Sequence, residues 1–243
     1  MQTIEKDRSE QSEKGSTDQA YERLRGEILA GARAPRSPLR FEQMKLESGF
    51  GMSALREALI RLEAEGMVIS ERHRGFRVAP LKLSELRDIN RVRILTETNA
   101  LELAVAHGDA AWEGEILSAL HRLLRQPGHG IRSPASTDAD TWEAHHLAFH
   151  RALLAACPSE WLLRFAEMLY PQYQRYRRYI WRLANASETS HATANVDMEH
   201  REIADRVLQR DAEGAARLLK QHYENNVEML VRICAAHPGA LEA

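Results

Sequence analysis

After Leu83, one feature restricts the fold more than any other: every long segment has helical periodicity. Apolar residues recur at three- and four-residue spacings, which is typical of amphipathic helices and not of strands. The periodic segments are 84–107, 112–125, 140–156, 160–184, 191–210 and 211–235. A stretch rich in Gly, Pro, Ser and Asp at 126–140 predicts a loop, and Pro171 predicts a kink or a break. Residues 81–243 are therefore predicted to form an all-helical bundle.

The first eighty residues have a different pattern. Residues 1–15 are polar and lack periodicity, which predicts a disordered tail. Residues 16–80 begin with three short helical patterns, at 20–32, 40–50 and 51–68. The alternating residues that follow predict two short strands with a tight turn near Arg74 and Gly75. The sequence thus predicts a mainly α protein with an N-terminal winged helix-turn-helix, three helices plus a hairpin, and a C-terminal all-α bundle.

Composition excludes several classes of protein. Apolar residues make up 44% of the 243 residues, a globular value that excludes wholesale disorder. The two cysteines, Cys157 and Cys234, imply no disulfide framework. No apolar run approaches the roughly 20 residues of a membrane span, and the N-terminus lacks a signal-peptide core. We therefore expect a cytoplasmic protein without a membrane partner.

The net charge of −2 at pH 7 hides an uneven distribution. Residues 16–80 contain eleven Lys or Arg and nine Asp or Glu, whereas residues 81–243 contain nineteen and twenty-two. The slightly basic unit is compatible with binding to DNA phosphates. Because its positive excess is small, affinity for DNA is expected to come from a few placed arginines and from dimerisation rather than from a broad positive field.

The N-terminal unit carries a specific run of residues. LREALIRLEAEGMV follows ILAG and precedes RGFRV, and this order resembles the DNA-binding domain of GntR-family bacterial transcription regulators. The resemblance implies that the helix within this run enters the major groove of an operator and that the wing contacts DNA beside it. The residues that it places at phosphate- or base-contacting positions are Arg40, Met52, Ser53 and Arg56, with His73, Arg74 and Gly75 at the tip of the wing.

Two positions depart from the family pattern. The family usually begins this helix with Ser-Arg and has a proline two residues before the Arg of REAL, whereas this chain has Gly51-Met52 and Ala54. Glycine is an acceptable N-cap, so the helix is expected to form, while the missing arginine predicts an atypical operator. Apart from the resemblance, the same run is also compatible with an amphipathic helix bearing solvated charges, or with a winged helix that binds another protein.

Four of the eleven histidines lie on apolar stripes of the predicted bundle. His146 and His150 are four residues apart and share one helix face, and His200 and His222 lie on apolar stripes of two later helices. A single inward histidine is usually a core residue whose hydrogen bonds are satisfied. Several imidazoles gathered in an apolar bundle would be costly without a shared partner, so the pattern favours a metal site.

Arg93 is a second anomaly, because it lies on the inward stripe of the first bundle helix. It is expected either to pair with Glu97 one turn later or to bind an anionic ligand, and the two roles are compatible. Aromatic and basic side chains just after Pro171 are candidates for the lining of a pocket for such an anionic ligand. Only one or two of these side chains can face inward. They are Tyr173, Tyr176, Arg177 and Tyr179.

Three further motifs, LAFHRALLAA, EHREI and RDAEGAARLLKQH, lie within residues 82–235. They resemble the all-helical ligand-binding (FCD) domain of the FadR-type branch of GntR regulators. The resemblance implies a divalent metal held by one Asp and three His, which correspond here to His150, His200 and His222. His146 stands where the family has Asp. A four-histidine set favours Zn²⁺ or Ni²⁺. If His146 turns away, a three-histidine site remains, and its neighbour His145 is expected to face solvent.

The predicted function is that of a bacterial transcription regulator, usually a repressor in this family, which binds a palindromic double-stranded DNA operator as a homodimer. The resemblance also implies a small organic acid as effector, with Arg93, Tyr173 and Arg177 as the expected effector-binding residues.

Two other interpretations stay open. One is a metal-dependent enzyme acting on a small carboxylate in the helical unit. No HExxH motif is present, however, and the nearest candidate general bases are Glu143 and Glu199. The other is a metal-stabilised interaction module without an effector, which would require Glu97 to occupy Arg93 fully.

Overall fold

The computed structural model describes the backbone of residues 2–125, 137–184, 186–239 and 241–242, and within these the side chains outside 2–14, 137–139 and 186–194. The chain divides into two compact units, residues 1–81 and 82–243. Among the described residues, no helix combines the length and the apolar content that a transmembrane span requires. Most of the predicted loop at 126–140 lies outside the described residues, and its last residues belong to a helix that begins at Thr137.

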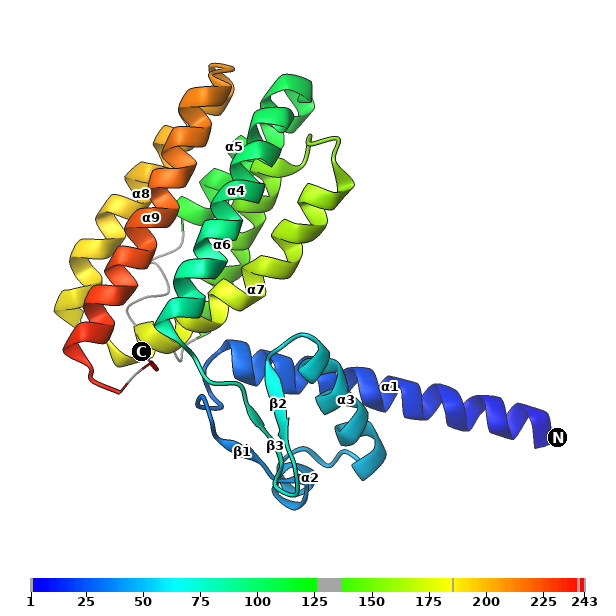
Figure 1. Cartoon of the computed structure of the whole chain (residues 1–243). Helices are drawn as coiled ribbons and strands as arrows, with labels where there is room; N and C mark the ends of the chain where they lie inside the picture. The colour runs from blue at the N-terminus through cyan, green and yellow to red at the C-terminus, as the bar shows by residue number, and fades with distance from the viewer. Residues whose placement is uncertain (1, 126–136, 185, 240, 243) are drawn as a thin grey trace. The chain divides into compact units, whose positions relative to one another are not determined.

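The first unit is a winged helix-turn-helix, as the sequence predicts. Its elements, in chain order, are α1 (Gln2–Leu29), β1 (Pro38–Leu39), α2 (Phe41–Ser48), α3 (Met52–Ala64), β2 (Val68–Glu71) and β3 (Gly75–Val78) (Figure 1). The fully buried Leu55, Leu59 and Leu62 of α3 pack in one apolar cluster with Leu24 and Ile28 of α1. The helical spacing of these leucines is therefore what joins the two helices.

The start of α1 corrects one prediction. The sequence predicts a disordered tail over residues 1–15, whereas α1 begins at Gln2 and gives the backbone from there a helical form. The physical reason lies in the composition of this segment, which is rich in Gln, Glu and Lys. These straight-chain residues lose little side-chain freedom in a helix, so a polar segment without apolar periodicity still has helix propensity.

The wing is a three-stranded antiparallel sheet in the order β1-β3-β2. Val68 pairs with Val78 and Glu71 pairs with Gly75, so β2 and β3 form the predicted hairpin. Strand β1, two residues long, joins the other edge of β3 through Pro38 and Leu39 and was not predicted, because so short a strand has no detectable alternation.

The second unit is an all-helical bundle. Its helices are α4 (Leu83–His107), α5 (Ala110–Leu124), α6 (Thr137–Leu154), α7 (Glu160–Leu183), α8 (Ala186–Leu208) and α9 (Ala212–Ala236). Helix α4 packs against α7 and α9, α8 packs against α9, and α5 packs against α6 (Figure 1). Pro171 lies inside α7, which continues through it, so Pro171 does not divide the segment.

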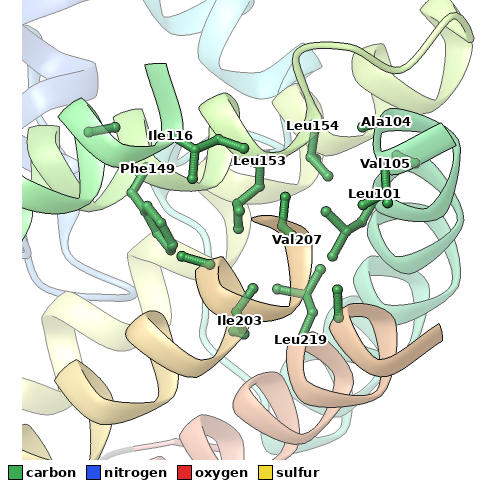
Figure 2. Close-up of a cluster of buried hydrophobic side chains, with 14 of the residues drawn as sticks. Leu101, Ala104, Val105, Ile116, Phe149, Leu153, Leu154, Ile203, Val207 and Leu219 are labelled. Carbon is green, nitrogen blue, oxygen red and sulfur yellow. The ribbon is translucent and has the colours of Figure 1, made fainter. Parts of the chain in front are cut away.

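One apolar cluster fills one part of the bundle. Figure 2 shows Leu101 of α4, Ile116 of α5, Phe149 of α6, Ile203 of α8 and Leu219 of α9 converging, and each of them is essentially inaccessible to solvent. Burial of such side chains stabilises the fold by about 1.5–3 kcal/mol each. Because α6 and α8 are held by this cluster, the histidines on the same faces of these helices are held as well.

Candidate functional site

The bundle brings together the four histidines that the sequence singles out. His146 and His150 come from α6, His200 from α8 and His222 from α9, and all four are buried. One ring nitrogen from each lies within 4.8 Å of the corresponding atom of the others. Nε2 of His146 is 3.2 Å from Nε2 of His150. The ring of His200 is centred 4.7 Å from that of His222. His145, half-buried, is outside this group.

Hydrogen bonds at the back of two rings fix their tautomers. The hydroxyl of Tyr170 donates to Oε1 of Glu143, and it lies 3.1 Å from Nδ1 of His146. A hydroxyl has one hydrogen, so Tyr170 must accept from Nδ1–H of His146. That leaves Nε2 of His146 as an unprotonated acceptor facing the cluster.

The same logic holds for His150, because the hydroxyl of Tyr223 donates to Glu97 and lies 3.2 Å from Nδ1 of His150. The Nε2 atoms of His146 and His150 therefore present lone pairs to each other across 3.2 Å. Two facing lone pairs repel, and a shared cation between them removes that repulsion. This arrangement, with a polar group behind each ring, is the one that metal-bound histidines adopt.

His222 has a carboxylate behind it. Its Nδ1 lies 2.7 Å from Oε2 of Glu199, and the other oxygen of Glu199 accepts from Nδ2 of Asn225. A carboxylate that accepts from Nδ1–H orients the ring and makes the opposite nitrogen a better ligand. Since Glu199 is on α8 and His222 on α9, the contact also ties two helices of the cluster together.

The donor set fits a divalent transition metal. A tetrahedral Zn²⁺ with Zn–N bonds of about 2.0–2.1 Å separates its ligand nitrogens by roughly 3.3 Å, close to the 3.2 Å between Nε2 of His146 and Nε2 of His150. Imidazole suits Zn²⁺ and Ni²⁺ better than Mg²⁺ or Ca²⁺, which require oxygen ligands. His146 thus faces the cluster, at the position where the family resemblance implies Asp.

Burial and neighbouring charges keep the imidazoles of His146 and His150 neutral. The pKa values of His146 and His150 lie well below the ordinary 6.5, first because burial disfavours the charged form and then because the other histidines and nearby arginines repel a proton. A neutral imidazole is the form that binds a metal. The cluster is therefore ready to bind a cation at neutral pH without releasing protons from these two residues.

Arg93 pairs with Glu97, as one of the two sequence interpretations expects. Nε of Arg93 donates to Oε1 of Glu97 over 2.7 Å, and both side chains are almost fully buried. The guanidinium also lies over the rings of Tyr223, at 4.2 Å, and Tyr173, at 4.6 Å. Burial alone would lower the pKa of Arg93, but the Glu97 carboxylate raises it above its ordinary value, so the charge of this arginine is permanent.

The other two expected effector-binding residues, Tyr173 and Arg177, are also buried on α7. Arg177 forms an ion pair with Glu143, and its guanidinium lies 4.9 Å from the ring of Trp142, which stacks on His146. Three buried donors here have no hydrogen-bond acceptor among the described residues: the hydroxyl of Tyr173, Nε of Arg177 and Nε1 of Trp142. Buried donors without acceptors are rare and indicate a missing ligand, ion or water.

In the first unit, the residues expected to contact DNA lie on the surface. Met52, Ser53 and Arg56 are exposed on α3, and Arg40 is exposed at the start of α2. The guanidinium of Arg56 lies 5.5 Å from the ring of Phe41, and no ion pair of Arg56 is found among the described residues. Its charge is therefore available to a phosphate.

His73 and Arg74 lie in the exposed turn between β2 and β3, and Gly75, also exposed, begins β3. Gly75 has φ of +80°, a left-handed conformation that favours glycine, and His73 has φ of +65°. The positive φ angles of His73 and Gly75 therefore define the conformation of the hairpin that carries the candidate DNA contacts of the wing.

Sequence reasoning missed the side chains behind the histidines. Tyr170, Tyr223 and Trp142 occur in stretches that resemble ordinary core, and Glu199 is named only as a candidate general base. In the structure Glu199 bonds to His222 of the next helix. The sequence offered one signal, the position of Glu199 next to the inward-facing His200. That position does not show that Glu199 bonds to His222 on the neighbouring helix.

Comparison with known proteins identifies two matching families. Residues 16–78 match the family described as bacterial regulatory proteins, gntR family, and residues 88–225 match the FCD domain. The chain is 36% identical over 210 residues to an uncharacterized HTH-type transcriptional regulator, BphR, of Paraburkholderia xenovorans, covering 86% of this chain and 83% of that protein. It is 30% identical over 217 residues to the HTH-type transcriptional repressor GlaR of Escherichia coli, covering 89% and 96%.

Solved structures share the fold. The structure of E. coli McbR/YncC superposes with a TM-score of 0.71 at 20% identity, covering 89% of this chain and 97% of that one. A transcriptional regulator GntR from Rhodococcus sp. RHA1, described as putative, gives a TM-score of 0.67 at 19% identity, covering 91% and 99%. At these identities the likeness concerns the fold alone.

Proposed function

Because the chain belongs to the GntR family of bacterial regulatory proteins and carries an FCD domain, we propose that it is a metal-containing regulator whose operator binding responds to a small carboxylate. It acts in the cytoplasm as a homodimer on a palindromic operator, and it represses transcription. The name of one relative, a transcriptional repressor, supports the sign of the effect. Two-fold symmetry of the dimer is the usual match for a palindromic site.

The metal part of the proposal rests on one observation, the convergence of Nε2 of His146 and Nε2 of His150 with tautomers that leave both atoms unprotonated. His146, His150, His200 and His222 would hold the ion. When bound, the metal would supply a Lewis acid that could take a carboxylate oxygen as a fifth ligand beyond the four imidazoles. Zn²⁺ and Ni²⁺ are the ions that four imidazoles favour.

The carboxylate part rests on the donors beside the cluster. The hydroxyl of Tyr173 and Nε of Arg177 are buried without an acceptor among the described residues, and a carboxylate accepts hydrogen bonds from such groups. Arg93 pairs with Glu97, and its guanidinium lies over the rings of Tyr173 and Tyr223. A contact between Arg93 and the effector, which is compatible with this pairing, stays part of the proposal.

The nearest carboxylates do not favour the enzyme alternative. Glu143 accepts from Tyr170 and Arg177, and Glu199 accepts from Asn225 and bonds to His222. Glu143 and Glu199 are therefore both occupied by hydrogen bonds to other side chains, and neither is placed as a general base next to a free coordination position of the metal. We therefore propose binding without turnover.

Fluorescence anisotropy of a labelled duplex, selected from a random library by the zinc-loaded chain, tests the proposal. We expect at least one of acetate, lactate, succinate, benzoate and octanoate to change the Kd for the duplex by about 5- to 150-fold, the usual range of coupling between two sites. The His200→Ala variant should bind the duplex without responding to the acid. If zinc is bound and no acid changes the Kd, the carboxylate response is wrong.

A further inference from the structure

The first turn of α3 begins with an exposed methionine. Met52 is 38% exposed, whereas Ala54 and Leu55 of the same turn are buried in the core of the first unit. Gly51, which precedes Met52, has no side chain, and the space beside its α-carbon is open. In a recognition helix the N-terminal residues are the ones that contact base edges. Met52 therefore lies where a base pair would meet the helix.

The positive charge near this turn comes from two arginines around the start of α2. The guanidinium of Arg56 lies 5.5 Å from the ring of Phe41, the first residue of α2, and Arg40, the preceding residue, is exposed. Guanidinium groups suit phosphate oxygens, which position a protein on DNA without reading its sequence. Met52 and Ser53 bring no charge to the first turn of α3. The surface thus has one part that suits the DNA backbone and another part without a cation.

A methionine side chain restricts which base it can contact favourably. It has no hydrogen-bond donor, and its thioether sulfur is only a weak acceptor. All four bases present polar groups in the major groove, but thymine alone adds an apolar one, its C5-methyl group. A polar base edge covered by Met52 would lose its hydrogen bonds to water without replacement, which weakens binding by about 5- to 150-fold. A thymine methyl group in the same place strengthens binding, because it leaves water.

We infer that Met52 reads the C5-methyl group of one thymine in each half-site of the operator. The inference rests on the proposed operator binding through α3, and it specifies the base that this position selects. The family pattern usually has arginine here, and an arginine at a base edge favours guanine, whose O6 and N7 accept two hydrogen bonds from it. The exchange for methionine therefore changes the preferred base at this position from guanine to thymine.

The test uses zinc-loaded full-length protein and the duplex that it selects from a random library. Each thymine is replaced in turn by deoxyuridine, which lacks only the methyl group, and fluorescence anisotropy gives the Kd. We expect one replacement in each half-site to weaken binding by about fourfold, the effect of one buried methyl-sized group. In Met52→Ala the same replacement should have almost no effect, because the side chain that covers the methyl group is gone. This double-mutant cycle assigns the methyl contact to Met52 itself.

Met52→Arg tests the same position in the opposite direction. It should shift the preference at the identified base pair from thymine toward guanine by about tenfold or more. The matched control, Ile60→Arg, adds the same charge at an exposed position about 12 Å further along α3 and should keep the preference for thymine. If no uracil replacement changes the Kd, or if one weakens Met52→Ala and the unmodified chain equally, the inference is wrong while operator binding stands. A chain that selects no duplex would contradict both the inference and the proposed function.

Discussion

Nδ1 of His222 on α9 lies 2.7 Å from Oε2 of Glu199 on α8. This contact sets the direction of the imidazole. It joins a residue that the sequence predicts to be a metal ligand to one that the sequence analysis names only as a candidate general base. The metal affinity of the proposed site therefore depends on the packing of α8 against α9 as well as on the histidines themselves.

The first prediction concerns this pair. Glu199→Gln removes the negative charge that supports Nδ1–H of His222, and loss of such an outer partner typically lowers metal affinity by about 10- to 100-fold. Competition between the protein and a chromophoric zinc chelator measures the change. Glu228→Gln, on the exposed face of α9, is the control. Equal zinc affinity in both variants would show that Glu199 does not support the centre.

The second prediction concerns the buried pair of Arg93 and Glu97, whose side chains are 2% and 4% exposed. Glu97→Gln leaves the guanidinium buried without its counter-charge, so the free energy of unfolding should fall by about 3–5 kcal/mol. Chemical denaturation of the zinc-free protein measures it. The control Glu102→Gln removes an exposed carboxylate from the same helix and should change stability by less than about 0.5 kcal/mol. Similar stabilities of the two variants would contradict the role of the pair.

The third prediction is a pH dependence of the metal-free protein. In the folded state the pKa values of His146 and His150 lie well below 6.5, so below about pH 6.5 the unfolded chain takes up protons that the folded chain does not. The free energy of unfolding therefore falls as the pH falls, by up to about 1.4 kcal/mol per pH unit for each histidine. Denaturation in the presence of a chelator between pH 8 and pH 5 measures this slope.

A variant isolates the contribution of one histidine to that slope. His150→Gln removes one titrating group and should flatten the pH dependence relative to that of the unmodified chain. Parallel slopes for His150→Gln and the unmodified chain would mean that His150 is protonated alike in the folded and unfolded states.

The fourth prediction concerns DNA. Arg56→Ala removes an exposed guanidinium from α3 that has no ion pair among the described residues, and it should abolish specific binding and reduce the dependence of log K on log salt by about one. Arg61→Ala, whose arginine pairs with Asp18 over 2.7 Å, is the matched control and should bind nearly as the unmodified chain does. Anisotropy titrations at several salt concentrations decide between them. Unchanged affinity in Arg56→Ala would exclude α3 as the recognition helix.

Local physical signals explain how much of this fold was predictable. The leucines at 55, 59 and 62 have helical spacing, so this spacing alone identifies α3 and its buried face. The same reasoning places His146, His150, His200 and His222 on inward faces. Strand β1 was not predicted, because its two residues, Pro38 and Leu39, have no detectable periodicity and pair with a strand far along the chain.

The hydrogen-bond partners of the histidines could not be predicted for a related reason. Periodicity says which face of a helix is buried but not which helix covers it. The contacts from Tyr170 to His146 and from Tyr223 to His150 cross helix interfaces, and so does that from Glu199 to His222. For Arg93, sequence reasoning left two roles open, and the pairing with Glu97 one turn later on the same helix could be named in advance because it is local.

The measurement that tests the central claim most directly is zinc K-edge X-ray absorption of the purified chain, with the metal content determined on the same sample. We expect about one zinc per chain, an ordered shell of imidazole nitrogens at about 2.0–2.1 Å, and loss of the bound zinc in His200→Ala. The proposed metal site would be contradicted if the unmodified chain bound no zinc. It would also be contradicted if the His200→Ala variant retained zinc without imidazole ligands.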